Sequence, residues 1–168
     1  MNIRLGTRDD ITEIMKIVRK TVDLMDKEGN DQWTGDYPTP DDFERDVANH
    51  TLHVAENNEG EILGMITVDQ VATDEYNQVT WRQEEPYYVF HRLAVSVKAR
   101  GLGLAQTLIQ HAEEYAIDQG VPYMKTDTYS LNEKAQQLFE KLGYHKVGEM
   151  EWLNKDHPFY CYDKILTK

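Results

Sequence analysis

The helix predicted after Val95 opens with Lys98-Ala99-Arg100-Gly101-Leu102-Gly103-Leu104-Ala105, within a sequence of 168 residues. This opening contains no Ser, Thr, Asp or Asn, so the first backbone N–H groups of the helix lack a side-chain acceptor. The helix dipole places partial positive charge there, and glycines let a ligand approach the backbone closely. The stretch therefore predicts an anion site at a helix N-terminus, with a water-capped turn as the alternative.

The charge pattern around this opening supports the same prediction. The chain has 18 basic and 30 acidic residues and a net charge of −12, which makes it a poor partner for nucleic acid or an anionic membrane surface. The stretch from Pro86 to Ala112 nevertheless contains no Asp or Glu, where an even distribution would place about five. It carries Arg92, Lys98 and Arg100 instead. One part of an acidic protein is thus suited to an anionic ligand.

The order of predicted elements indicates a single α/β domain over residues 1–168. Hydrophobic periodicity predicts strands at 3–5, 52–56, 62–68, 87–95, 123–128, 146–150 and 159–166, and helices at 11–28, 40–49, 104–116 and 131–142. Residues 72–85 are predicted as an excursion between strands, and a capping box from Ser130 is expected to open the last helix. We expect a central mixed sheet flanked by helices.

Composition excludes several classes of protein. The apolar runs are too short to cross a bilayer, and residues 1–10 have no hydrophobic signal core. Cys161 is the only cysteine, which excludes an internal disulfide and a multi-cysteine metal site. No two histidines have i, i+4 metal-ligand spacing, so no metal is predicted. A cytoplasmic location is expected, and a homodimer is left open.

Two motifs carry a resemblance to a known family. The first is R/Q-x-x-G-x-G/A, matched by Arg100 to Ala105 after Leu93-Ala94-Val95. The second is N-x-x-A-x-x-[LF]-[YF]-x-x-x-G-[FY], matched from Asn132 to Tyr144 with every spacing kept. In this order the pair resembles the GNAT N-acetyltransferase superfamily over nearly the whole chain. The Rossmann pattern fails at Gln106, and the G-K-[ST] of a nucleotide P-loop is missing.

The resemblance implies a GNAT-like fold and acetyl-CoA as the acetyl donor. The strand end at Leu93, Ala94 and Val95 would pair its backbone with the pantetheine arm. Beside Arg100, a run of backbone N–H groups would hold the diphosphate. This run consists of Gly101, Leu102, Gly103, Leu104, Ala105 and Gln106. Asn132 would contact the cofactor from the later helix, or else it is simply a polar first-turn residue.

His91 is the candidate general base. On a regular strand it shares a face with Leu93 and Val95, close to the backbone that should hold the thioester. Imidazole titrates near neutral pH, and some arylalkylamine-type relatives carry a histidine at this place. The alternative is a half-buried strand histidine bonded to a backbone group.

The general acid of the family is commonly a Tyr at the position that Phe139 occupies here. Phenylalanine has no hydroxyl, so Tyr144 and Tyr129 are the nearest substitutes in sequence. Each has a packing role as the alternative. A CoA thiolate is a good leaving group near neutral pH, so the reaction does not require a dedicated acid.

The acceptor site is predicted in the loop between the first two helices, with the candidates Asp31, Gln32, Trp33 and Tyr37. Aromatic rings beside carboxylates suit a cationic amine, although anchoring of Trp33 to the core is an equal alternative. Glu84 and Glu85 with nearby tyrosines are candidates for an opposite rim.

Together these features predict an acetyl-CoA-dependent N-acetyltransferase that acts on a small primary amine by direct attack in a ternary complex. A peptide N-terminus or lysine is the alternative acceptor. The alternative from another class is a non-catalytic acyl-CoA-binding regulatory module.

Overall fold

The computed structural model describes residues 1–167 and contains seven strands and four α-helices in that range. The helices are α1 (Ile11–Lys27), α2 (Pro40–Ala48), α3 (Leu104–Asp118) and α4 (Glu133–Lys141). The strands are β1 (Asn2–Leu5), β2 (Leu52–Glu56), β3 (Ile62–Asp69), β4 (Tyr88–Val95), β5 (Tyr123–Tyr129), β6 (His145–Met150) and β7 (Phe159–Ile165). Lys168, the last residue of the predicted domain, lies outside the described residues.

The strand order is β1-β2-β3-β4-β5-β7-β6. β4 and β5 pair in parallel, whereas β1 with β2, β2 with β3 and β7 with both its neighbours pair antiparallel. The predicted α/β class, with a mixed sheet flanked by helices, is confirmed. The predicted elements differ from the observed ones only by small shifts at their ends.

The chain divides into two compact units, each described here by itself. Unit 1 consists of Met1–Val68 and His91–His111, and unit 2 consists of Asp69–Phe90 and Ala112–Lys168. The prediction of one domain over the whole chain stays a prediction. Within residues 1–167, no helix combines the length and apolar composition needed to cross a membrane.

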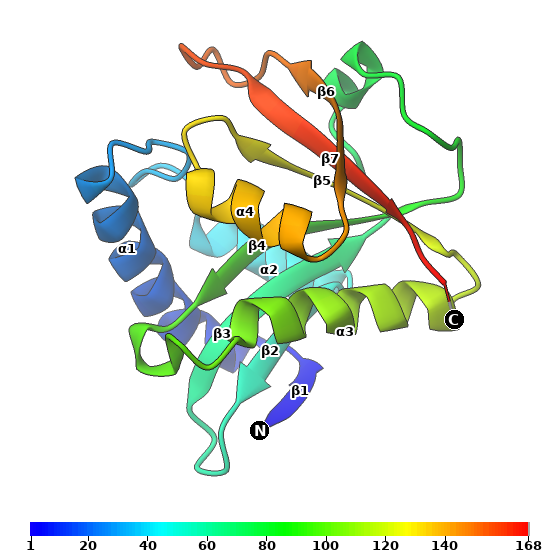
Figure 1. Cartoon of the computed structure of the whole chain (residues 1–168). Helices are drawn as coiled ribbons and strands as arrows, with labels where there is room; N and C mark the ends of the chain where they lie inside the picture. The colour runs from blue at the N-terminus through cyan, green and yellow to red at the C-terminus, as the bar shows by residue number, and fades with distance from the viewer. Residues whose placement is uncertain (168) are drawn as a thin grey trace. The chain divides into compact units, whose positions relative to one another are not determined.

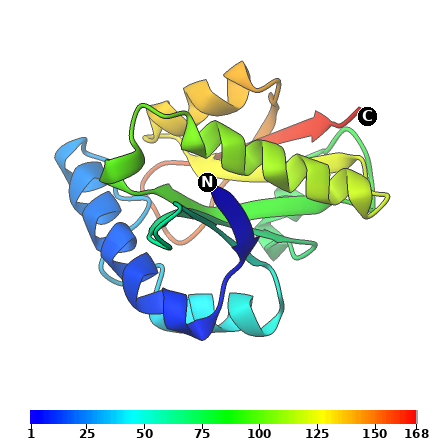
Figure 2. The same cartoon turned by 90° about the horizontal axis from the view of Figure 1, so that it is seen from below.

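Unit 1 is built on β1, β2 and β3, which lie side by side in Figure 1. α1 buries Ile14 and Val18, α2 buries Phe43, and these side chains pack on Val54 and Met65 of the paired strands. Figure 2 shows α1 and α2 on one side of β2 and β3, and the start of α3 on the other. Both faces of these strands are therefore covered within the unit.

Gly64 of β3 sets how closely the start of α3 approaches the strands. A Cβ at this position would lie 2.9 Å from the backbone oxygen of Ala94 and 3.2 Å from side-chain atoms of Leu104 and Leu108. Only a residue without a side chain fits this space. The close approach fixes the first turns of α3 beside the end of β4.

Unit 2 contains β5, β7 and β6 side by side, together with α4 (Figure 1). On one face, Phe139 of α4 meets Phe90, Tyr144 and Tyr162 with ring centroids 5.4 to 6.1 Å apart. Such edge-to-face and tilted arrangements are favourable for aromatic pairs. Phe139 is therefore a core residue of this unit.

The predicted excursion before β4, residues 72–85, belongs to unit 2 and makes polar contacts with its strands. The Tyr76 hydroxyl donates to Asp127 at 2.7 Å, and the Arg82 guanidinium donates to Asp163 at 2.6 Å. Asp163 also accepts a 2.6 Å hydrogen bond from the Tyr123 hydroxyl. The polar residues of the excursion thus form hydrogen bonds and ion pairs, while Tyr76 and Val79 belong to the buried hydrophobic cluster of this unit.

The predicted capping box at Ser130 is wrong. The N-cap of α4 is Asn132, whose Oδ1 accepts from the Ala135 N–H at 3.2 Å, and the helix begins at Glu133. Ser130 still belongs to the turn after β5, since its N–H donates to the Pro158 carbonyl at 3.0 Å. Tertiary pairing of the turn thus moves the helix start two residues along the chain.

Candidate active site

The opening of α3 adopts an unusual backbone conformation. Gly101 and Gly103 have φ angles of +79° and +70°, the left-handed region that side-chain-bearing residues rarely adopt. No atom lies within 4 Å of the position that a Cβ would take on either glycine. Gly103 precedes the helix and has no side chain that could cap it. The first N–H groups of α3 are thus at an open helix N-terminus.

Two basic side chains beside this loop differ in their contacts. Lys98 forms a 2.9 Å ion pair with Glu61, and both side chains are well exposed. Arg100 is exposed and forms no hydrogen bond or ion pair with any residue in the range 1–167. The guanidinium of Arg100 is therefore available to an anionic ligand at the loop.

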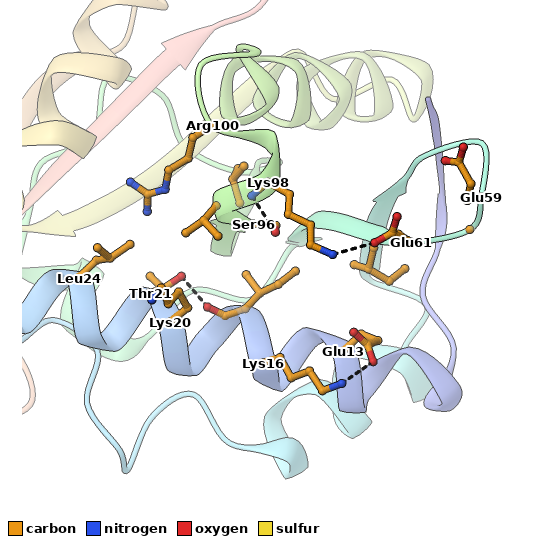
Figure 3. Close-up of a pocket in the computed structure, with 15 residues that line it drawn as sticks. Glu13, Lys16, Lys20, Thr21, Leu24, Glu59, Glu61, Ser96, Lys98 and Arg100 are labelled. Atoms are coloured by element: carbon orange, nitrogen blue, oxygen red, sulfur yellow. Dashed lines mark hydrogen bonds and ion pairs between the residues drawn. The ribbon is translucent and has the colours of Figure 1, made fainter.

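A cavity of about 550 Å³ borders the loop within unit 1. Figure 3 shows α1, with Lys20, Thr21 and Leu24, on one side of it and Lys98 and Arg100 on the other. The end of β4 contributes Val95 to the lining. Of the residues predicted to bind the cofactor, Val95 and Arg100 thus line this cavity, whereas none of residues 101–106 belongs to its lining.

The three residues at the end of β4 differ in burial. Leu93 and Val95 are half-buried, whereas the Ala94 side chain is buried in the core cluster of α1, α2, β2 and β3. The Ser96 N–H donates to the Leu63 carbonyl at 2.7 Å, which ties the residue after β4 to β3. The role of this strand end in holding pantetheine stays a prediction.

Arg92 interrupts the regular alternation on which the placement of His91 was based. Its φ angle is +47°, so β4 is irregular between His91 and Leu93. Strict two-residue alternation therefore does not apply across Arg92, and the shared face of His91, Leu93 and Val95 stays a prediction. His91 is half-buried in unit 1, and its role as base stays a prediction.

Sequence analysis missed a buried polar network around Arg92. Its guanidinium donates to both carboxylate oxygens of Asp46 at 2.8 Å and to the Tyr37 hydroxyl at 2.9 Å. Asp46 also accepts from the Thr67 hydroxyl at 2.8 Å. Paired charge-assisted bonds of this kind fix a side chain firmly, which explains how a residue other than glycine keeps a strained backbone conformation here. Its only sequence signal was a basic residue in the acid-free stretch.

The loop between α1 and α2 differs from the predicted acceptor site. Trp33 is 6% exposed and belongs to the core cluster, as the alternative of an anchor expects, and its role at the acceptor stays a prediction. The Tyr37 hydroxyl contacts Arg92. Asp31 is exposed and Gln32 is half-buried, with the Gln32 N–H donating to Asn30 at 3.0 Å. Of the four, the Asp31 side chain is the most accessible.

The weak candidate acid Tyr144 lies in the core of unit 2. Its hydroxyl donates to Glu113 at 2.8 Å, and burial, with Glu113 adding to it, raises the pKa of Tyr144 well above its usual value. Lys164 also contacts Glu113 at 3.1 Å. Tyr129 is buried as well and stacks near Phe159. Tyr144 is thus a packed, carboxylate-bonded residue, as the alternative of a packing role expects, and its role as the acid stays an untested prediction.

A histidine pair in unit 1 was not predicted. His111 Nε2 lies 3.0 Å from His53 Nδ1. Burial, with a smaller contribution from His111, lowers the pKa of His53 to about 4, so His53 is neutral near pH 7. Within residues 1–167 there is no group of three His, Cys, Asp or Glu side chains that could hold a metal ion.

Comparison with known proteins agrees with the geometry of the loop. The family model for GNAT-family acetyltransferases matches residues 20–144. A GNAT-family acetyltransferase of Streptococcus agalactiae is 29% identical, with a TM-score of 0.86 over 99% of this chain and 96% of that one. A Listeria monocytogenes GNAT-family structure, 22% identical with a TM-score of 0.77 over 98% and 94% of the two chains, adds likeness of fold alone.

A shorter similarity links the chain to curated proteins. Human N-acetyltransferase 8B is 33% identical over 67 residues, which are 40% of this chain and 29% of that protein. The matched stretch of rat N-acetyltransferase 8F1 is 34% identical and spans 26% of that protein. This chain therefore matches less than a third of the length of these relatives. Since the family model covers most of the chain, including the strand, the glycine loop and α3, the protein belongs to the GNAT family of acetyltransferases.

Proposed function

We propose that this protein is an N-acetyltransferase that moves the acetyl group of acetyl-CoA to a primary amine of a small molecule. The observation that carries the proposal is the opening of α3. There, two left-handed glycines leave space beside a helix N-terminus in a member of an acetyltransferase family. Such an opening favours a diphosphate through its N–H groups and its dipole.

The residues present fit acetyl-CoA. Beside Gly101 and Gly103 there is room for a phosphate group to approach the backbone, and a side chain on either residue would enter that space. Arg100 makes no competing ion pair within residues 1–167 and can pair with the diphosphate. The resemblance implies that backbone at Leu93 to Val95 holds the pantetheine arm.

Acetyl-CoA supplies an acetyl group activated as a thioester. In the proposed reaction the amine nitrogen bonds to the acetyl carbon in a ternary complex, the carbon–sulfur bond breaks, and sulfur leaves as a thiolate. His91 accepts the proton of the amine, directly or through a water. The Tyr144 hydroxyl is bonded to Glu113, and Phe139 has none, so neither serves as the acid in this scheme. A thiolate leaves without a dedicated acid.

A cationic small amine suits the charge of the protein. The net charge of −12 attracts cations over long distance, and Asp31 is exposed in the loop between α1 and α2. In this scheme the anionic donor, acetyl-CoA, binds at the glycine loop, where the surrounding stretch of sequence has no acidic residue. Donor and acceptor are thereby attracted by regions of opposite charge.

The test is release of free CoA thiol from acetyl-CoA by the purified protein. Small primary amines, peptides with free N-termini and lysine peptides are compared, and a reaction without acceptor corrects for hydrolysis. The proposal predicts the highest kcat/KM for a small amine. Preference for a peptide would show the alternative acceptor class. Tight CoA binding without turnover on any acceptor would favour a non-catalytic module, the alternative that Phe139 supports.

A further inference from the structure

Unit 2 contains a cavity of about 640 Å³ that the proposed transfer reaction does not use. The segment before β4 and one residue of β5, Lys125, line it. The lining residues on which the argument depends are Asp74, Trp81, Glu84, Glu85, Tyr87 and Lys125. We call this hollow the Lys125 cavity.

Lys125 is a buried amine that faces the cavity. It lies on the same face of β5 as Tyr123 and Asp127, since side chains two apart share a face, and both of these contact or approach the segment before β4. The side chain is only 6% exposed. Its Nζ lies 4.4 Å from the ring centroid of Trp81 and 4.1 Å from that of Tyr87.

The donors of this amine meet aromatic rings rather than hydrogen-bond acceptors. Lys125 Nζ has no hydrogen bond or ion pair among residues 1–167, although an ammonium has three donors. Asp163 is its partner in the β5–β7 register, but that carboxylate already accepts from Arg82 and Tyr123. Burial lowers the pKa of Lys125, as expected for a cation removed from water.

Lys146 of the same unit provides a comparison, because its amine also lies over an aromatic ring but is not buried. Its Nζ lies 3.5 Å from the centroid of Tyr160, but it pairs with a Glu149 carboxylate oxygen at 3.7 Å, and the residue is exposed to water. Lys125 is 6% exposed, and the cavity that it lines is an open space from which an acceptor can reach its donors, as water or as part of a ligand.

The opening of the cavity carries the opposite charge. Asp74, Glu84 and Glu85 line it and are exposed. The half-buried rings of Trp81 and Tyr87 line the same cavity and lie next to the buried amine. A ligand that matches this lining has an acceptor group for the amine, a short apolar part for the rings and a cation for the carboxylates.

We propose that the Lys125 cavity binds a small amino carboxylate, with the carboxylate at Lys125 and the ammonium at the acidic opening. A simple amine has no acceptor group for the Lys125 ammonium. A simple carboxylate is repelled by the acidic residues at the opening. Both halves are required. The proposal does not depend on acetyl transfer, because binding is measured without acetyl-CoA.

Calorimetry or ligand-observed NMR on the whole protein tests this with 4-aminobutyrate, 6-aminohexanoate, butyrate and n-butylamine. At least one amino carboxylate is expected to bind tenfold or more tightly than butyrate and n-butylamine. Lys125→Met should weaken that binding at least tenfold, and Lys146→Met, the matched control, should leave it unchanged. The double change Glu84→Gln and Glu85→Gln should weaken binding of the amino carboxylate. It should not weaken binding of butyrate, which has no ammonium group for these carboxylates.

Chemical labelling of the unmodified protein covers the case in which Lys125→Met does not fold. Amine-reactive trinitrobenzenesulfonate is applied with the amino carboxylate and, because the ligand's own amine consumes the reagent, with an equal concentration of n-butylamine as the reference. Mass spectrometry measures labelling at each lysine. Protection of Lys125 but not Lys146 supports the proposal. It is overturned if neither amino carboxylate binds at 10 mM, if n-butylamine binds as tightly, or if labelling of Lys125 is unchanged at saturation.

Discussion

The candidate site residues of unit 1 differ from those of unit 2 in whether their polar groups already have partners within the fold. In unit 1 the helix start at Gly103 has no capping side chain, and Arg100 makes no ion pair within residues 1–167. In unit 2 the side chain of Asn132 caps its own helix, and the Tyr144 hydroxyl bonds to Glu113. The unit 1 residues belong to the first family motif, Arg100 to Ala105, and the unit 2 residues belong to the second, Asn132 to Tyr144.

This difference separates groups available to a ligand from groups that stabilise the fold. A helix N-terminus without a side-chain cap gains acceptors only from water or a ligand, whereas a capped one is already satisfied. Substitutions in unit 1 should therefore change binding or turnover with modest effects on stability. Substitutions of the engaged residues in unit 2 should change stability with modest effects on turnover.

The largest expected effect is that of His91→Ala on turnover. A positioned general base contributes about 10²–10⁴-fold, so kcat should fall by that factor while CoA affinity stays near that of the unmodified protein. His145→Ala, an exposed strand histidine of unit 2, is the control and should retain full activity.

The pH–rate profile distinguishes catalysis by His91 from ionisation of the free amine. The acid limb should change in His91→Ala for two acceptors of different pKa. If turnover and the acid limb stay the same with both acceptors, His91 is a packed strand residue and the amine reacts in its neutral solution form.

Gly103→Glu should lower CoA affinity by about 100-fold, because a carboxylate would occupy the space of the diphosphate and repel it. Gly120→Glu is the matched control, since Gly120 has a similar φ of +77° and open space beside it. Both variants should lose about 1–2 kcal/mol of unfolding free energy from the left-handed backbone. Calorimetry should find weak CoA binding only for Gly103→Glu; equal affinities would remove the glycine loop from the site.

Tyr144→Phe should reduce stability by about 1–2 kcal/mol, since it removes a hydrogen bond to a charged group in a core. Lys164 still pairs with Glu113, which keeps the loss at the lower end. Urea unfolding measures the change, and kcat should stay within about twofold. A loss of kcat above tenfold at unchanged stability would instead make Tyr144 a proton donor.

The smallest expected effect is that of Asn132→Ala, which removes the cap of α4 and should reduce stability by about 1 kcal/mol. Asn132→Ser keeps a capping oxygen and should restore most of that loss. Relative to the unmodified protein, the CoA affinity of both Asn132 variants should fall by less than the CoA affinity of Gly103→Glu. If Asn132→Ser keeps the stability but loses CoA binding as fully as Gly103→Glu, the comparison between the units fails.

The fold was largely predictable from sequence because its signals are local. The periodic apolar residues of α1, the Pro40 start of α2 and the turn after Glu56 each determine an element from neighbouring residues. The error at Ser130 arose because its N–H pairs with Pro158, a contact 28 residues away that no local pattern contains.

The candidate site was less predictable, since its chemistry depends on contacts between distant residues. The glycine loop could be identified because left-handed glycines and the missing cap are local features. The Arg92–Asp46 pair joins residues 46 positions apart, and it accompanies the irregularity in β4 that sequence alternation could not foresee. Trp33 looked equally suited to core or ligand, and only its burial distinguishes the two.

The central claim is that the diphosphate of CoA binds the backbone at the start of α3. Amide NMR of the ¹⁵N-labelled protein tests it most directly, with CoA compared against pantetheine, which lacks the diphosphate. We predict that the amide signals of Gly101 and of Gly103 to Gln106 shift with CoA and stay in place with pantetheine. If these amides do not move at saturating CoA, or move equally with pantetheine, the diphosphate does not bind at this helix N-terminus.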